Sequence, residues 1–147
     1  MCEKTDTNRL KPGSLVMVKG FPCKVTETTT AKPGKHGSAK VILKAKDILT
    51  DKMYECTFHA GDMVDAPIVK RIEYTLLNID EDNLQMLDGA GEMKEDVNLP
   101  NTETHSHLTD VCKRIKSIFE DGKKECLVTV IQTLGKEQVI EVREGND

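Results

Sequence analysis

Residues 32–40, with the sequence KPGKHGSAK, bring together the side chains of this chain that could do chemistry. Pro33 restricts φ and Gly34 tolerates a positive φ, a pair that favours a type II turn. Gly37 removes a second Cβ close to the apex of that turn. The turn would therefore expose the primary amine of Lys35, so that a modifying enzyme or a large anionic partner could enclose it. A solvated turn that keeps a hairpin tip from aggregating would explain the same residues.

Charge is distributed unevenly along the chain around this loop. Five lysines and no Asp or Glu lie between residues 28 and 46, although the formal net charge of the chain is −4. Residues 1–71 contain 13 Lys and Arg against 8 Asp and Glu, whereas residues 72–147 contain 8 against 17. This asymmetry predicts two units that meet different surfaces, with a polyanionic partner for the first.

The loop does not have the pattern of a nucleotide-binding loop. Its GKHG segment lacks the GxxxxGK[ST] spacing, and no apolar strand leads directly into a helix that could bind phosphate at its N-terminus. His36 has no carboxylate or thiol neighbour in the sequence that would make it a general base. We interpret it as a loop side chain that forms hydrogen bonds or contacts phosphate.

An enzymatic or metal site elsewhere is a separate hypothesis, and its candidates are weak. His105 and His107 form an HxH pair in a polar loop, with no Cys or carboxylate at ligand spacing. His59 stands alone near a glycine. Residues 80–82 are acidic but lack the glycine and the closing glutamate of an EF-hand. We therefore predict no catalytic residue, no metal site and no bound cofactor.

The cysteines indicate a reducing compartment. All 5 lie at irregular spacing without a CxxC motif: Cys2, Cys23, Cys56, Cys112 and Cys126. Except for the first, they stand among apolar or strand-like neighbours, and we expect them to be buried, reduced thiols of a cytoplasmic protein. No run approaches the roughly 18 apolar residues that a membrane span requires, so we expect no membrane partner.

Short β-prone runs dominate the first half of the sequence. Residues 1–12 are polar and aperiodic, and we expect them to form a flexible leader. Strands are predicted near residues 15–18, 23–30, 41–43 and 53–58, and a loop at 61–67 leads into a further strand at 68–74. Several short strands at close spacing without a helical period predict a small barrel.

The second half combines strands with one helix. Strands are predicted near residues 74–79, 84–87, 93–99, 126–134 and 138–142. Apolar residues recur at spacings of three and four between Leu108 and Phe119, and Gly122 follows as a stop signal, which predicts a helix at about residues 107–121. Five strands with a helix before the fourth are the order of an OB-type barrel.

At this point the residues match a known family. The signature K-x-G-K-H-G-x-A-K, preceded by Phe21-Pro22-Cys23-Lys24-Val25, resembles the hypusine-containing translation factor five-A family of eukaryotes and archaea. The resemblance continues through residues 47–50, 52–55, 65–67, 70–71, 95–97 and 99–100, and so covers nearly the whole chain. It departs at Pro33, where many eukaryotic members have threonine, and at Ser38, where they commonly have histidine.

The resemblance implies a mainly β fold with two domains. Residues 13–71 would form an N-terminal SH3-like barrel that carries the hypusine loop at 31–40. Residues 72–147 would form a C-terminal OB-fold with one inserted α-helix. Lys35 would be the modified residue, converted by deoxyhypusine synthase with spermidine as donor, and further to hypusine where a deoxyhypusine hydroxylase acts.

The resemblance also implies a function in translation elongation and termination. A member of this family binds the ribosome and places its modified lysine near the acceptor end of the peptidyl-site tRNA. There it promotes peptide-bond formation at stalling sequences and peptide release. By position in the matched loop, the expected contacts with tRNA or with the modifying enzymes are Lys32, Gly34, His36, Gly37, Ser38 and Lys40.

The alternative is a generic RNA-binding module that acts through an unmodified basic hairpin. Two properties of the sequence disfavour it. The acidic C-terminal half repels phosphate, and a chain with no Trp, 2 Tyr and 3 Phe has few aromatic rings on which bases could stack.

Overall fold

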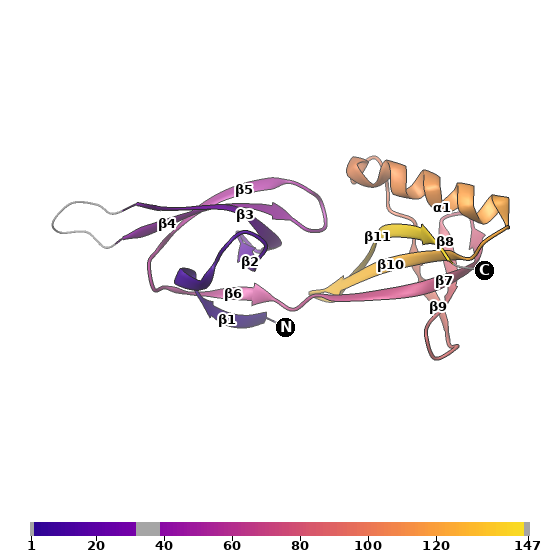
Figure 1. Cartoon of the computed structure of the whole chain (residues 1–147), viewed down its shortest axis with the longest axis horizontal. Coiled ribbons are helices and arrows are strands. Elements are labelled where there is room, and N and C mark those ends of the chain that lie inside the picture. Colours follow the sequence, from indigo (N-terminus) through magenta and orange to yellow (C-terminus); the bar gives the residue numbers. More distant parts are fainter. Residues whose placement is uncertain (1, 32–38, 146–147) are drawn as a thin grey trace. The chain divides into compact units, whose positions relative to one another are not determined.

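The computed structural model describes residues 2–31 and 39–145, and it is built mainly of β-strands (Figure 1). The chain divides into two compact units, Met1–Ile68 and Val69–Asp147. The resemblance places this boundary between residues 71 and 72.

The N-terminal unit contains a four-stranded antiparallel sheet and a two-stranded one. The first has the order β2 (Leu15–Val18), β3 (Phe21–Ala31), β4 (Lys40–Asp47) and β5 (Met53–His59). The second pairs β1 (Cys2–Asp6) with β6 (Met63–Pro67), and a short 3-10 turn, η1 (Thr7–Arg9), follows β1. Two long strands, β3 and β4, therefore flank the loop that the sequence singles out.

The flexible leader predicted for residues 1–12 is wrong for residues 2–6, because β1 pairs with β6 along its whole length, from Cys2 opposite Pro67 to Asp6 opposite Met63. The side chains of β1 are exposed or half-buried, so backbone hydrogen bonds rather than apolar burial hold it. A strand of this kind has no alternating apolar pattern. The same register shows that part of the loop predicted at 61–67 is strand β6.

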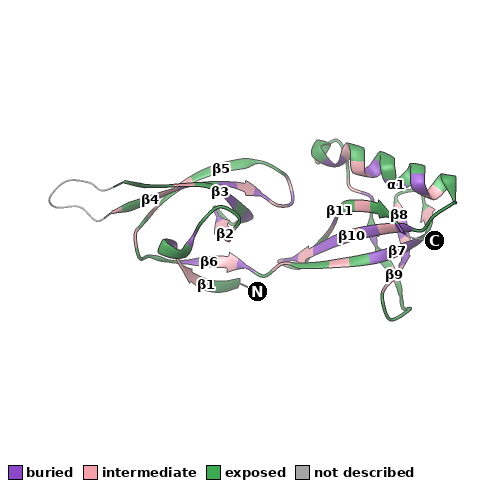
Figure 2. Ribbon diagram, viewed as in Figure 1, coloured by how far each residue is buried: buried purple, intermediate pink, exposed green. Residues whose placement is uncertain are grey.

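The core of this unit comes from alternating side chains of β2, β3 and β4. Val16, Val25 and Leu43 are almost completely buried, and the exposed residues between them face solvent (Figure 2). Asp47 ends β4 and is also buried. Its carboxylate accepts hydrogen bonds from the backbone N–H groups of Leu49 (2.8 Å) and Thr50 (3.3 Å), which fixes the turn between β4 and β5.

The C-terminal unit is a five-stranded antiparallel sheet in the order β11-β10-β7-β8-β9. Its strands are β7 (Lys70–Asp80), β8 (Asn83–Leu87), β9 (Met93–Asn98), β10 (Cys126–Thr133) and β11 (Lys136–Glu144). The predicted strands at 68–74 and 74–79 are one continuous strand, β7. Its irregularity between Leu76 and Asn78 is a register shift against β8.

One helix lies between the third and fourth strands of this unit, as the sequence predicts. A 3-10 turn, η2 (Ser106–Leu108), leads into α1 (Thr109–Asp121). The helix buries Cys112, Ile115 and Ile118 against the sheet. It ends at Gly122, which has φ 66° and donates its N–H to the carbonyl of Ile118, the left-handed cap that glycine favours.

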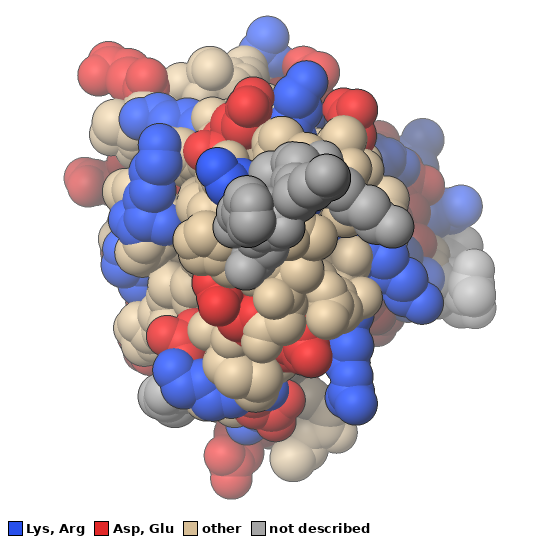
Figure 3. All heavy atoms as spheres, turned by 90° about the vertical axis from the view of Figure 1, so that its left-hand side faces the viewer, with Lys and Arg blue, Asp and Glu red and all other residues tan. Residues whose placement is uncertain are grey.

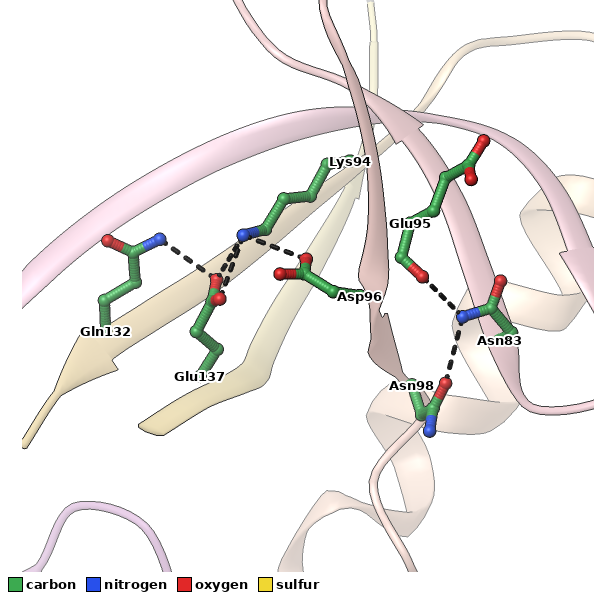
Figure 4. A network of polar contacts seen from close by, with 7 residues as sticks. All are labelled: Asn83, Lys94, Glu95, Asp96, Asn98, Gln132 and Glu137. Carbon is green, nitrogen blue, oxygen red and sulfur yellow. Dashed lines mark hydrogen bonds and ion pairs between the residues drawn. The ribbon is translucent and has the colours of Figure 1, made fainter. Parts of the chain in front are cut away.

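Polar contacts join the two edge strands of this sheet, β9 and β11 (Figure 4). The ammonium group of Lys94 on β9 lies 2.9 Å from the carboxylate of Glu137 on β11 and 3.0 Å from that of Asp96. These contacts raise the pKa of Lys94 above its ordinary value, chiefly through the hydrogen bond to Glu137. Gln132 donates a further hydrogen bond of 3.0 Å to Glu137. The network therefore connects the two edge strands of the sheet through their side chains.

Candidate functional site

The candidate site is the hairpin formed by β3 and β4 with the loop between them. Lys35 and the predicted contacts Lys32, Gly34, His36, Gly37 and Ser38 all lie outside the described residues, whereas Lys40 is described as the first residue of β4. The site is therefore characterised from the strands that carry the loop and from the residues at its base.

The strands bring the two ends of the loop together. The ladder between β3 and β4 extends from Cys23 opposite Asp47 to Ala31 opposite Lys40. Its register shifts at Thr26, whose hydroxyl donates a hydrogen bond of 3.0 Å to the carbonyl of Lys44. The side chains of β3 beyond this bulge are mostly exposed (Figure 2). A bulge bends and twists a strand pair, so it sets the direction in which the hairpin presents its tip.

A third strand and its turn support the second end of the loop. β5 pairs with β4 up to the position where His59 lies opposite Lys40. Beyond that pair, the backbone N–H of Ala60 donates a hydrogen bond of 2.8 Å to the carbonyl of Ala39. The base of the loop is thus fixed on β3, β4 and the turn that follows β5.

The lysines of the hairpin differ in how far they are neutralised. Lys44 lies 3.7 Å from Glu27, and Lys46 lies 3.5 Å from Asp51, so acids just outside the lysine-rich segment partly offset its charge. Lys40 is exposed and has no ion pair with any residue in the described parts of the chain. Figure 3 faces this end of the hairpin and shows basic and acidic side chains interleaved. The uncompensated charge therefore lies next to the loop.

The comparisons with known proteins cover both units. Residues 3–60 match the family described as "Translation initiation factor 5A-like, N-terminal", and residues 68–143 match "Eukaryotic elongation factor 5A hypusine, DNA-binding OB fold". The chain is 42% identical over 138 residues to "Eukaryotic translation initiation factor 5A" of Dictyostelium discoideum, covering 94% of this chain and 82% of that protein. The chain belongs to the translation factor 5A family.

Another curated relative and two solved structures also match the 5A family. "Eukaryotic translation initiation factor 5A-1" of Saccharomyces cerevisiae is 37% identical over 136 residues, covering 92% of this chain and 82% of that protein. Among solved structures, the "Translation initiation factor eif-5a family protein" of Naegleria fowleri superposes with a TM-score of 0.88 at 32% identity, covering 97% and 98% of the two chains. The protein of Methanococcus jannaschii gives 0.68 at 25% identity, covering 97% and 95%.

Membership of the 5A family confirms several predictions. The fold is mainly β, with an N-terminal SH3-like domain and a C-terminal OB domain. The chain is a translation factor, and since the family consists of translation factors, it is not an enzyme. The loop signature had therefore identified the correct family from a short segment.

Other side chains considered from the sequence do not form a site in the described part of the chain. The rings of His105 and His107 are tilted with centroids 6.0 Å apart, and His105 shares a hydrogen bond of 2.8 Å with the hydroxyl of Thr104. No group of three or more His, Cys, Asp and Glu that could hold a metal ion occurs among residues 2–31 and 39–145. In the same ranges, no helix has the length and apolarity to cross a membrane.

The cysteines of the described chain are free thiols, and most are buried. Cys23, Cys112 and Cys126 are buried, Cys56 is half-buried and Cys2 is exposed. Burial raises the pKa of Cys23 and of Cys126 to about 11, so both are protonated at neutral pH. A protonated, enclosed thiol is a poor nucleophile, which agrees with the interpretation of these residues as small core side chains.

No sequence pattern indicates two of the groups that hold the base of the hairpin. The contact between Ala60 and Ala39 is made by backbone atoms, which any residue types would supply. Thr7, whose side chain contacts the turn after β5, lies in the segment predicted to be flexible. Thr7 lies outside any alternating or helical apolar pattern. Its contact with the turn becomes visible only when the pairing of β1 with β6 is known.

Proposed function

We propose that the β3–β4 hairpin presents Lys35 first to a modifying enzyme and then to the ribosome. In its modified form, deoxyhypusine or hypusine, this lysine extends to the acceptor end of the peptidyl-site tRNA. It promotes peptide-bond formation at stalling sequences, such as runs of proline, and peptide release. The observation that supports this proposal best is the conjunction of the KPGKHGSAK signature with family matches that cover both units.

The modification is a group transfer to the lysine amine. Deoxyhypusine synthase breaks the bond between the secondary amine and the four-carbon arm of spermidine, and the arm forms a new bond to Nζ of Lys35. The diamine that remains leaves with the proton displaced from Nζ. Because the product is longer than lysine and has a second cationic nitrogen, it reaches further into a phosphate-lined RNA site than lysine can.

Charge at the base of the loop supports recognition of RNA without base specificity. Lys40 is exposed and lacks an ion pair in the described chain, whereas Lys44 and Lys46 have carboxylate neighbours. Lysine contacts with phosphate fix the position of a protein on RNA and carry no sequence information. Such contacts suit a factor that must act on every tRNA.

The proposal is tested in a reconstituted translation system with an mRNA that encodes a run of prolines. Protein treated with deoxyhypusine synthase and spermidine should increase the rate of synthesis through the run, and untreated protein should not. Equal stimulation by both preparations would instead favour the alternative, an RNA-binding module that uses its unmodified hairpin. A message without a stalling sequence, on which both preparations should have a small effect, serves as the control.

A further inference from the structure

We propose that Thr7 is a positioning residue for the loop that carries Lys35, acting through the turn at residues 59–62. This inference rests on the proposed function, since it assumes that Lys35 is the modified residue. We call the hydrogen bonds from Thr7 to this turn the Thr7 clamp. The clamp consists of described residues throughout, and the turn that it holds contacts Ala39, the first described residue after the loop.

Thr7 binds the turn with three hydrogen bonds. Its hydroxyl donates to the carbonyl of His59 (3.1 Å) and accepts from the backbone N–H of Gly61 (3.1 Å), and its own backbone N–H donates to the carbonyl of Asp62 (3.0 Å). The residue is only 1% exposed. The buried hydroxyl of Thr7 therefore donates one hydrogen bond to this turn and accepts one from it.

The same turn contacts the end of the loop directly. Ala60, between the two residues bound by the Thr7 hydroxyl, donates its N–H to the carbonyl of Ala39 (2.8 Å). His59 lies opposite Lys40 in the ladder between β5 and β4. Fixing the peptide groups on both sides of Ala60 thus fixes the donor that holds Ala39. The position of the loop's second end consequently depends on a residue more than 30 positions earlier in the sequence.

The hydroxyl is not needed for the pairing of the N-terminal strand. β1 ends at Asp6, and its ladder with β6 uses backbone atoms from Cys2 to Asp6. Thr7 lies beyond this ladder, at the start of η1. A valine there would have nearly the same shape and would leave the strand pairing intact. It would also leave the carbonyl of His59 and the N–H of Gly61 without these partners.

The C-terminal unit contains a matched control for removing a buried hydroxyl. Thr133 is 3% exposed, and its hydroxyl has no hydrogen-bond partner in the described part of the chain. Thr133→Val therefore removes a buried hydroxyl without breaking a hydrogen bond. Thr7→Val makes the same chemical change and breaks two.

The experiment compares Thr7→Val, Thr7→Ser and Thr133→Val in the full chain. Native-state hydrogen exchange should show the Ala60 amide exchanging about tenfold faster in Thr7→Val, since loss of a hydrogen bond changes an opening equilibrium by about this factor. With deoxyhypusine synthase and spermidine, Thr7→Val should raise the KM for the protein substrate several-fold with little change in kcat. Thr7→Ser, which keeps the hydroxyl, and Thr133→Val should match the unsubstituted protein in both measurements.

A core substitution separates positioning from general stability. Val16 is completely buried in the same unit, and its backbone pairs with Cys23 of β3 rather than with the turn, so Val16→Ala should destabilise the unit without changing the KM of the folded protein. If Val16→Ala raises the KM as much as Thr7→Val does, Thr7 has only a structural role and the proposal is wrong. Unchanged Ala60 exchange and unchanged KM in Thr7→Val would overturn it as well.

A second variant tests the clamp if Thr7→Val does not fold. Gly61 has φ +87° with open space where a Cβ would lie, so Gly61→Ala strains the turn without a clash. Gly13, with φ +96° and equally open space, provides the control substitution Gly13→Ala outside the turn. Faster Ala60 exchange and a raised KM in Gly61→Ala alone would support the clamp, and equal behaviour of the two variants would refute it.

Failure of the proposed function would give a different result. If deoxyhypusine synthase does not modify the unsubstituted protein at all, the assignment of Lys35 is wrong whatever Thr7 does. In that case the exchange of the Ala60 amide still decides whether Thr7 fixes the turn, and the role of the clamp in positioning an acceptor lysine is refuted.

Discussion

The two units use positively charged side chains differently. In the C-terminal unit, Lys94 lies within 3.0 Å of two carboxylates and connects edge strands, and two arginines pair across β10 with glutamates at 2.8 and 2.9 Å. In the N-terminal unit, Lys4 lies 2.6 Å from Asp65, but in the β3–β4 hairpin the contacts of Lys44 and Lys46 are 3.7 and 3.5 Å long, and Lys40 has no ion pair in the described chain. The C-terminal unit uses these cations in close ion pairs within its sheet, whereas the hairpin of the N-terminal unit leaves Lys40 available to a partner.

The largest effect is expected from Lys35→Arg, which tests the unit with available cations. Arginine keeps the positive charge but cannot be the acceptor of the aminobutyl group, so the variant should fold normally and fail to stimulate synthesis through a run of prolines. The rate should fall to that without the factor. Full activity of the variant in the reconstituted assay would show that charge alone, rather than the modification, carries the function.

A large effect on stability is expected from Lys94→Met, which tests the other unit. The side chain of Lys94 is 20% exposed and that of Glu137 is 26% exposed, so removing the ammonium leaves the partly buried Glu137 carboxylate without its cationic partner. We expect a loss of about 1–3 kcal/mol in the free energy of unfolding. Hydrogen exchange of the amides of β9 and β11 would measure it.

The matched control for that variant is Lys44→Met in the N-terminal unit. Its ion pair with Glu27 is long, and the two side chains are 51% and 62% exposed. Exposed pairs of this kind contribute little, so the change in unfolding free energy should be below about 0.5 kcal/mol. Equal losses in the two variants would contradict the difference between the units.

A moderate effect on RNA binding is expected from Lys40→Gln. Because this lysine has no carboxylate neighbour in the described chain, its removal should weaken binding to tRNA and reduce the slope of log affinity against log salt by about one. Lys46→Gln, which removes a cation that Asp51 partly neutralises, should reduce the slope less. Titrations of labelled tRNA at several salt concentrations would distinguish the two lysines.

The smallest effect concerns the pH dependence of the C-terminal unit. The hydrogen bonds from Arg143 lower the pKa of Glu73 in the folded protein. A carboxyl whose folded pKa is depressed contributes stability above its unfolded pKa, roughly 4.3, and loses that contribution as the pH falls through the folded value. In Arg143→Gln the NMR titration midpoint of Glu73 should rise toward the ordinary value. An unchanged midpoint would mean that this ion pair is not formed in solution.

Much of the fold could be predicted because it follows from periodic burial. The helix was found from the apolar spacing that places Cys112, Ile115 and Ile118 on one face, and its end from Gly122. The strands around Val16, Val25 and Leu43 alternate between core and solvent. The helical spacing and the strand alternation of apolar residues both arise because one face of the element is buried. A sequence pattern can therefore reveal such elements.

The remaining elements escaped prediction because backbone atoms hold them. β1 has the sequence CEKTD with no buried residue, and its partner β6, which the sequence predicts as a loop, is a short strand that buries only Val64 and Pro67. The hydrogen bonds that tie the candidate site to the rest of the unit were missed as well, since neither the amide of Ala60 nor the hydroxyl of Thr7 belongs to a pattern. The reactive lysine could be recognised from its motif, whereas the hydrogen bonds that hold the base of its loop could not.

The most direct test of the account is the mass of the peptide that contains Lys35, measured on protein purified from its natural source. The account predicts that this lysine carries the four-carbon amine transferred from spermidine, with or without a hydroxyl group, in most of the molecules. Unmodified Lys35 in native material would contradict the central claim and would leave a basic hairpin that binds RNA without modification.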